Sequence, residues 1–253
     1  MESGTPRIKC QWNSKRGSAR KENRDACGVF ASDAATFAIV MDASEKGERG
    51  VEFNAKWIDL LLQAMGGYLT GPSVEQVQGE MREAHKRLRP PSFLLETASY
   101  CALLIRHDIG KAWAFNCGDC RIGVEYSHGV VWFSPVHSLA NIQGGPFTVE
   151  HANNPDRHTV TRCLKVRRFT TPEVIEIEYS PSFTWILASD GYWIEALKGG
   201  ALDVVSEDDQ SWLRLNNRLV PLCESDAKNL LVAGLHVKPG YSDCESELVS
   251  LAN

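Results

Sequence analysis

Apolar runs that end in an acidic residue recur along this chain. "FAIVMDA" carries an apolar segment into Asp42, and "WILASDGYW" carries another into Asp190. "AWAFNCGD" ends in the same way at Asp119. Short apolar runs bounded by turn residues are typical of buried strands. We therefore expect buried strands whose ends bring three carboxylates to the rim of a sheet.

The pattern of apolar and polar positions predicts further strands. Residues 28–42 indicate two strands that meet at a polar turn. The stretch from 97 to 134 indicates a run of strands, with hairpin turns at 108–110 and 127–129. The segments 173–181 and 183–190 indicate a further pair of strands, and a short last strand is expected at 247–252.

Three segments carry helical signals. Residues 51–69 place apolar side chains at positions 53, 57, 60, 61 and 64, a helical period that ends at a glycine pair. Residues 72–88 begin with Pro-Ser and are mostly polar. The third candidate is 225–236, in which Ser225 or Asp226 would be the N-cap.

Strands in runs, with helices inserted early and late, favour an α+β fold over alternating βαβ units. We expect a β-sandwich with helices packed outside it. Residues 134–160 are rich in Pro, Asn, Gly and His, and they indicate a long loop, where functional residues are often found.

Composition narrows the class of protein. Apolar residues make up 43% of the 253 residues, and the net charge is −5, which argues against a general nucleic-acid binder. No apolar stretch approaches the ~18 residues of a membrane span, and the first residues lack the apolar core of a signal peptide. The eight cysteines are scattered, as is typical of reduced thiols in a cytoplasmic protein.

Two more carboxylates extend the set at the strand ends. Asp25 lies just before the first strand of 28–42, and Asp243 lies before the last strand. Any one of these aspartates is more often a turn or cap residue than a ligand. Several acids on one rim, however, demand cations, and hard oxygen ligands suit Mg²⁺ or Mn²⁺. Arg20 is placed to bring a guanidinium to a phosphate.

The order of these segments resembles the protein phosphatase 2C (PPM) family of metal-dependent serine/threonine phosphatases, in the form typical of bacteria. The most specific similarities are "LASDGYW" and "GDCR". The others run in family order from about residue 17 to residue 250: "RKENRDA", "FAIVMDAS", "ETASYCALL", "FSPVHSLA", "TVTRCLK" and "YSDCESELVSL".

The resemblance implies one catalytic domain over residues 1–253, an α+β four-layer α-β-β-α sandwich with two mostly antiparallel sheets. It implies two Mn²⁺ or Mg²⁺ ions and a weaker third, and attack on phosphoserine or phosphothreonine by a metal-bridging hydroxide. The substrates would be phosphorylated Ser/Thr proteins, and a Ser/Thr kinase is a natural partner; neither nucleic acid nor a membrane is expected.

The resemblance also implies a role for each residue of the site. Asp42 would bridge two ions, with the carbonyl of Ala43 as a further ligand. Asp190 and Asp243 would complete that site, and Asp119, with Asp190, would bind the third ion. Arg20 would hold the phosphate, and Asp25 would orient water.

The chain departs from the family pattern near these residues. Arg24 replaces a metal-ligating Glu, Ser44 replaces a His proposed as general acid, and Cys244 replaces an Asn. These departures keep open a second hypothesis, a weak or inactive phosphatase-like module that binds and regulates a kinase or phosphoprotein. A redox or zinc role for Cys117 and Cys120 is a weaker alternative, because their C-x-x-C spacing has no second pair and falls in an expected hairpin.

Overall fold

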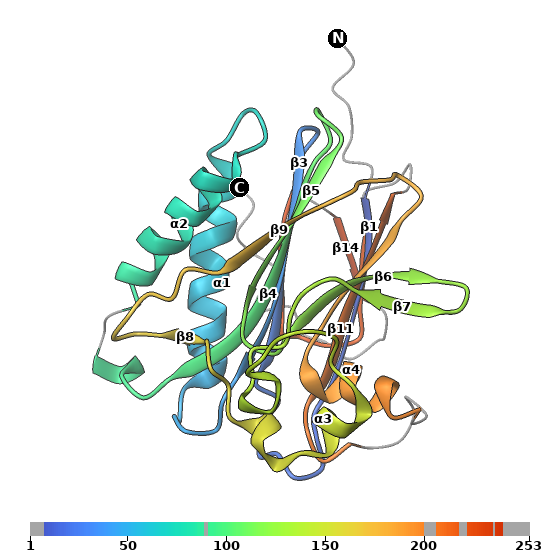
Figure 1. Cartoon of the computed structure of the whole chain (residues 1–253). Coiled ribbons are helices and arrows are strands. Elements are labelled where there is room, and N and C mark those ends of the chain that lie inside the picture. Colours follow the sequence, from blue (N-terminus) through green and yellow to red (C-terminus); the bar gives the residue numbers. More distant parts are fainter. Residues whose placement is uncertain (1–7, 89–90, 200–205, 218–221, 235, 240–253) are drawn as a thin grey trace.

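The computed structural model describes residues 8–88, 91–199, 206–217, 222–234 and 236–239. Within these ranges two seven-stranded sheets are stacked face to face, with helices on both outer faces (Figure 1). The first sheet has the order β14-β12-β1-β11-β10-β6-β7. The second has the order β13-β2-β3-β4-β5-β9, and β8 pairs with β4 beside it. This α+β sandwich confirms the predicted fold class.

The strands of the first sheet are β1 (Ile8–Lys15), β6 (Arg121–Tyr126), β7 (Gly129–Trp132), β10 (Thr184–Ala188), β11 (Gln210–Asn217), β12 (Leu222–Ser225) and β14 (His236–Pro239). Those of the second are β2 (Asp25–Ala31), β3 (Ala35–Ala43), β4 (Thr97–Arg106), β5 (Lys111–Cys117), β8 (Leu164–Lys165), β9 (Glu173–Ile177) and β13 (Leu230–Ala233). Most pairs are antiparallel; β1–β12, β12–β14 and β2–β13 are parallel.

Two long helices cover the second sheet. They are α1 (Gly50–Gly66) and α2 (Val74–Lys86). The predicted apolar period of α1 faces inward, since Phe53, Trp57 and Leu61 are fully buried. At the start of α2, Ser73 Oγ accepts from the amide of Gln76, and the Gln76 side chain accepts from the Ser73 amide. This capping box fixes the helix where the sequence predicted it.

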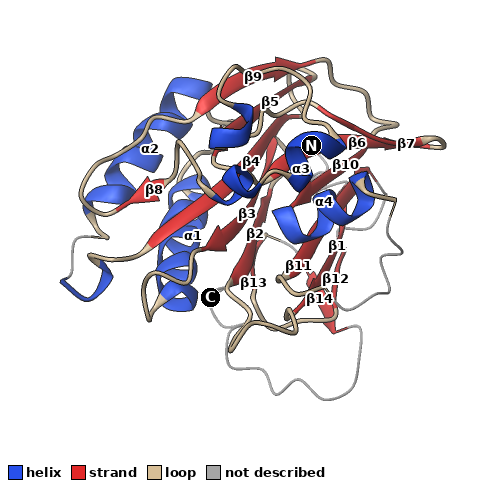
Figure 2. Ribbon diagram, turned by 60° about the horizontal axis from the view of Figure 1, so that its bottom comes forward, coloured by secondary structure: helices blue, strands red, loops and turns tan. Residues whose placement is uncertain are grey.

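The outer face of the first sheet is covered by shorter elements. They are α3 (Val149–Asn153), α4 (Asp190–Leu197) and single 3₁₀ turns at Leu139–Asn141 and Pro155–His158 (Figure 2). A further 3₁₀ turn, Pro91–Phe93, follows α2 in the chain. Trp193 of α4 and Phe147 pack edge to face in this layer. The segment predicted as a long loop, 134–160, thus contains α3 and two 3₁₀ turns. Three clusters of buried apolar side chains lie between the four layers of backbone.

The helix predicted at 225–236 is wrong. Residues 230–233 form β13, which pairs in parallel with β2. Ser225 Oγ accepts from the amide of Ala227 and donates to the Ala227 carbonyl, so it closes a local turn and caps no helix. Ser and Asp serve turns as readily as helix caps, and the short apolar run was ambiguous between strand and helix.

One expected hairpin differs from the structure, and one expected pair of strands is divided between the two sheets. The segment around "CGDC" leaves β5 in the second sheet and enters β6 in the first, so it connects the two sheets. Likewise, 173–181 supplies β9 of the second sheet and 183–190 supplies β10 of the first. The period of apolar residues identifies strands, but it carries no information about the sheet that each strand joins.

The expectation of eight reduced thiols is wrong for one pair. Cys10 and Cys223 form a disulfide, at opposed positions of the parallel pair β1–β12. Cys27, Cys101, Cys117, Cys120 and Cys163 are free and buried. In the described part of the chain no helix is long and apolar enough to cross a membrane. The predicted strand 247–252 and Asp243 lie outside the described residues.

The contact between α1 and β2 depends on a glycine. A Cβ on Gly28 would lie 2.3 Å from Ile58 Cγ2, whereas a Cβ on Gly79 in α2 would meet nothing within 4 Å. We predict that Gly28→Ala lowers the free energy of unfolding by about 1–3 kcal/mol, because the helix and sheet must separate. Gly79→Ala is the matched control and should raise it by about 0.5–1 kcal/mol. Urea unfolding measures both; equal effects would contradict this packing.

Candidate active site

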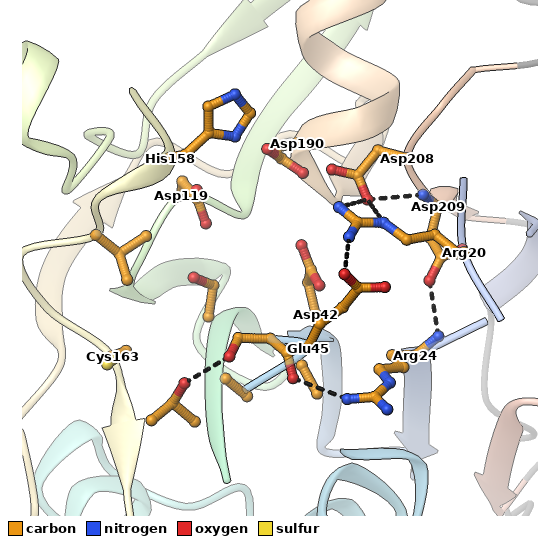
Figure 3. Close-up of a pocket in the computed structure, with 16 residues that line it drawn as sticks. Arg20, Arg24, Asp42, Glu45, Asp119, His158, Cys163, Asp190, Asp208 and Asp209 are labelled. Atoms are coloured by element: carbon orange, nitrogen blue, oxygen red, sulfur yellow. Dashed lines mark hydrogen bonds and ion pairs between the residues drawn. The ribbon is translucent and has the colours of Figure 1, made fainter. Parts of the chain in front are cut away.

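One end of the sandwich holds a pocket of about 230 Å³. The strand ends of both sheets meet there: β2 and β11 begin at this end, and β3 and β10 finish at it. Figure 3 shows carboxylates gathered around it, with the guanidinium of Arg20 close to Asp208. The lining residues are Arg20, Arg24, Asp42, Ala43, Ser44, Glu45, Thr97, Ala98, Ser99, Asp119, His158, Val160, Cys163, Asp190, Asp208 and Asp209.

Asp25 and Asp42 face each other across two strands. They are paired in the antiparallel register of β2 and β3, and Asp42 is paired with Ser99 of β4 on its other side. Asp25 is 1% exposed, and its Oδ2 accepts a 2.8 Å hydrogen bond from Ser189 Oγ. Its Oδ1 has no hydrogen-bond partner among the described residues.

Asp190 and Asp119 enter the pocket from the first sheet. Asp190 is the first residue of α4, directly after β10. The indole of Trp193, one turn further along, donates a 2.8 Å hydrogen bond to the carbonyl of Asp119. This bond ties the connection between the sheets to α4. The buried Trp193 thus holds the backbone of Asp119 next to the helix that begins with Asp190.

Gly191 explains why a glycine follows the acid in "ASDGYW". A Cβ at this position would lie 2.1 Å from the carbonyl oxygen of Asp209. The start of β11 can therefore pass close to α4 only if residue 191 has no side chain. That close approach brings Asp208 and Asp209 to the pocket beside Asp190.

Asp209 organises the segment that carries the two arginines. Its carboxylate accepts from the amide of Gly17 at 2.9 Å and from the amide of Arg24 at 2.8 Å. Asp208 pairs with Arg20, at 2.8 Å from Nε and 2.7 Å from Nη2. Neither aspartate was predicted as a site residue. The signal was present, because "DDQSWLRL" is another apolar strand flanked by acids.

The Arg24 guanidinium is held by loop carbonyls. Its Nη1 donates to the carbonyls of Ser44 at 3.0 Å and Gly47 at 2.7 Å, and its Nη2 pairs with Glu22 at 3.0 Å. It therefore fixes the segment between β3 and α1 instead of projecting freely among the carboxylates. No non-glycine residue in the described ranges has a positive φ, so the backbone at Ala43, whose carbonyl was predicted as a ligand, is unstrained.

The carboxylates of the pocket raise one another's pKa. Burial raises the pKa of Asp25 to about 7, and the negative charge of Asp209 contributes to this. Burial and the charges of Asp25 and Asp190 hold the pKa of Asp42 well above its usual range. Burial and the charge of Asp119 do the same for the pKa of Asp190. Such mutual elevation is the signature of like charges collected at a functional site.

The donor chemistry fits divalent cations. Asp25 Oδ1 and Asp190 Oδ1 are buried without a hydrogen-bond partner among the described residues, and carboxylate oxygens are the ligands that Mg²⁺ and Mn²⁺ prefer. The described acids, histidines and cysteines include no group of three already placed to hold an ion. Two of the carboxylates are paired with arginines instead: Asp208 with Arg20, and Asp190 with Arg157 at 3.3 Å.

The structure brings together most of the residues that the sequence predicted. Arg20, Asp42, Ala43, Asp119 and Asp190 line the pocket, and Asp25 is buried on the neighbouring strand, paired with Asp42. Asp243 lies outside the described residues. Sequence reasoning missed Asp208, Asp209, His158 and Arg157; the last two lie in the 3₁₀ turn at Pro155–His158, inside a segment without periodicity.

No family model and no curated protein matches the sequence. Solved structures do match its fold. The PPM Ser-Thr phosphatase MsPP of Mycobacterium smegmatis, solved with cacodylate, aligns with a TM-score of 0.68 at 19% identity, over 82% of this chain and 97% of MsPP. Stp1 of Staphylococcus aureus, a serine/threonine phosphatase, aligns with a TM-score of 0.68 at 18% identity, over 85% and 97%.

A third match is the catalytic domain of the serine/threonine phosphatase PstP in complex with two manganese ions. It aligns with a TM-score of 0.64 at 14% identity, over 83% of this chain and 98% of that domain. These alignments cover nearly the whole of each phosphatase domain. This chain therefore has the fold of the PPM serine/threonine phosphatases.

Proposed function

We propose that this protein is a metal-dependent phosphatase of the PPM type that hydrolyses phosphoserine or phosphothreonine in proteins. The observation that carries the proposal is the pocket itself. Buried aspartates from both sheets surround one cavity, and the guanidinium of Arg20 lies at its rim. A buried cluster of like charges is unfavourable by several kcal/mol without cations, so a protein that keeps it has a use for them.

The residues that would hold the cations are Asp42, Asp119, Asp190 and Asp208, with the carbonyl of Ala43. In this assignment Asp208 takes the place that the sequence gave to Asp243, because it lies two residues before β11, the strand next to β10, and lines the pocket. When bound, Mn²⁺ or Mg²⁺ would supply positive charge that acidifies water and stabilises the phosphoryl oxygens.

The chain's own groups would bind and orient the reactants. Arg20 would hold two phosphoryl oxygens through its planar fork of N–H groups. Asp25 would accept a hydrogen bond from water through its unpartnered Oδ1, since its other oxygen is engaged by Ser189. Ser44 offers no acid of suitable pKa for the leaving group, which predicts slower turnover than an enzyme with a histidine there.

A regulatory module without useful catalysis is the second candidate. Arg24 favours it, because a fixed positive charge lines the same pocket as Asp42. The unpartnered oxygens of Asp25 and Asp190 favour the enzyme, since they have no structural role to fulfil. A partner kinase and a cytoplasmic location stay predictions in either case.

Mutation of Asp190 tests the proposal. We predict that Asp190→Asn reduces Mn²⁺-dependent hydrolysis of an aryl phosphate and of a phosphothreonine peptide by roughly 10²-fold or more, because one anionic ligand is lost. Asp33→Asn is the matched control: Asp33 is exposed in the turn before β3, and the same charge is removed. Equal activity in the two variants, with both folded, would contradict the assignment of Asp190.

Without metal, the free energy of unfolding should depend on pH, because Asp25 is buried close to other acids. The pKa of Asp25 is about 7 in the folded protein and about 3.9 when unfolded. Its folded form therefore binds the extra proton between about pH 4 and 7, so stability is lost as the pH rises through that window. In EDTA we expect the free energy of unfolding to fall from pH 5 to 8 by on the order of a few kcal/mol.

Asp25→Asn should flatten this slope, and Mn²⁺ should restore stability at about pH 8 because it binds the ionised carboxylates. Urea unfolding at several pH values, with and without Mn²⁺, measures both effects. Stability in EDTA that rises over the same window would refute the account of the buried charges.

A further inference from the structure

Arg20 is paired with two acids in this structure. Its Nε and Nη2 lie 2.8 and 2.7 Å from Asp208 Oδ1, and its Nη1 lies 2.7 Å from Glu45 Oε2 (Figure 3). Each of the three guanidinium nitrogens thus contacts a carboxylate. The guanidinium has five N–H groups, so Nη1 and Nη2 each keep one that these acids do not use. A phosphoryl group bound to those two would lie next to the Glu45 carboxylate, and the repulsion between like charges favours displacement of one of the two acids.

Glu45 is the acid that is easier to displace. Its side chain is 52% exposed, and its contact with Arg20 is the ion pair that it makes within the described residues. The Asp208 side chain is 24% exposed, and its Oδ1 also accepts a 2.9 Å hydrogen bond from the amide of Asp209. Exposed ion pairs contribute little to stability, so a dianionic phosphate can replace this one.

The backbone around Glu45 is held on both sides. The amide of Ser44 donates to the carbonyl of Thr97 at 2.9 Å, and the carbonyl of Gly47 accepts from Arg24 at 2.7 Å. Displacement of Glu45 therefore needs only rotation of its side chain. The carboxylate then stays at the rim of the pocket, beside the phosphoryl group that has replaced it.

We propose that Glu45 is a specificity-determining residue: it competes with phosphate for Arg20 and, once displaced, selects substrates that carry a cationic side chain next to the phosphorylated residue. This inference deepens the proposed function and rests on it for the nature of the substrate. A neutral or acidic neighbour would leave the displaced carboxylate repelled by the phosphoryl group, whereas a lysine or arginine neutralises it.

The competition is tested by binding of inorganic phosphate, which needs no turnover. In one Mg²⁺-containing buffer, calorimetry on Glu45→Gln should give a Kd roughly two- to fivefold lower than that of the wild type. Glu48→Gln is the matched control, because Glu48 is exposed on the same segment and lies outside the pocket lining. It should leave the Kd within about 1.5-fold of the wild type, since exposed charges at a distance are screened.

A double-mutant cycle shows whether the effect passes through Arg20. In an Arg20→Gln background, Glu45→Gln should no longer tighten phosphate binding, because the guanidinium for which Glu45 and phosphate compete is absent. The proposal is overturned if Glu45→Gln and Glu48→Gln shift the Kd equally, if the gain persists without Arg20, or if phosphate binds none of the folded variants.

Selectivity is tested with two phosphothreonine peptides that differ in one flanking residue, Lys or Gln. The wild type should prefer the Lys peptide by about two- to fivefold in kcat/KM, and Glu45→Gln should lose that preference while Glu48→Gln keeps it. A preference unchanged by Glu45→Gln would refute the selection. Absence of hydrolysis in every variant, with the shift in phosphate Kd intact, would contradict the proposed function and leave the competition at Arg20 supported.

Discussion

Repulsion among buried carboxylates is the constraint on which this site depends. Burial raises the pKa of Asp25, Asp42, Asp119 and Asp190, and the charge of at least one other aspartate adds to the rise in every case. Loss of solvation makes such a buried cluster unfavourable even before the repulsion is counted. The sandwich supports it because both sheets, two helices and a well-packed core hold the backbone of each acid in place.

Hydrogen bonds and ion pairs with arginines offset part of the repulsion between these carboxylates. Ser189 satisfies one oxygen of Asp25, Arg157 pairs with Asp190, and Arg20 pairs with Asp208. Asp208 pairs with Arg20 through Oδ1 alone, so in the proposed function its other oxygen would be the one offered to a cation while Arg20 binds an anion. The electrostatics of the pocket and the proposed binding of a phosphoryl group would then depend on the same few contacts.

Much of this arrangement is readable from the sequence, and the exceptions have physical causes. The apolar runs that end in Asp42, Asp119 and Asp190 predicted both the buried strands and their convergence. The segment at 225–236 was misassigned because Ser225 closes a turn that mimics a helix cap. Asp208 was missed although acids border its strand, because it stands before the strand and not at its end, and its approach to Asp190 depends on the close contact between Gly191 and Asp209. The pairing of Cys10 with Cys223 likewise follows from strand order, which periodicity does not encode.

The central claim is that this pocket collects carboxylates in order to bind divalent cations. Anomalous X-ray diffraction from crystals soaked in Mn²⁺ tests it most directly. The account predicts at least one manganese peak within ligand distance of Asp42, together with oxygens of Asp190 or Asp208. Well-ordered crystals in which the pocket holds no manganese, or in which Mn²⁺ binds only at surface acids elsewhere, would contradict it.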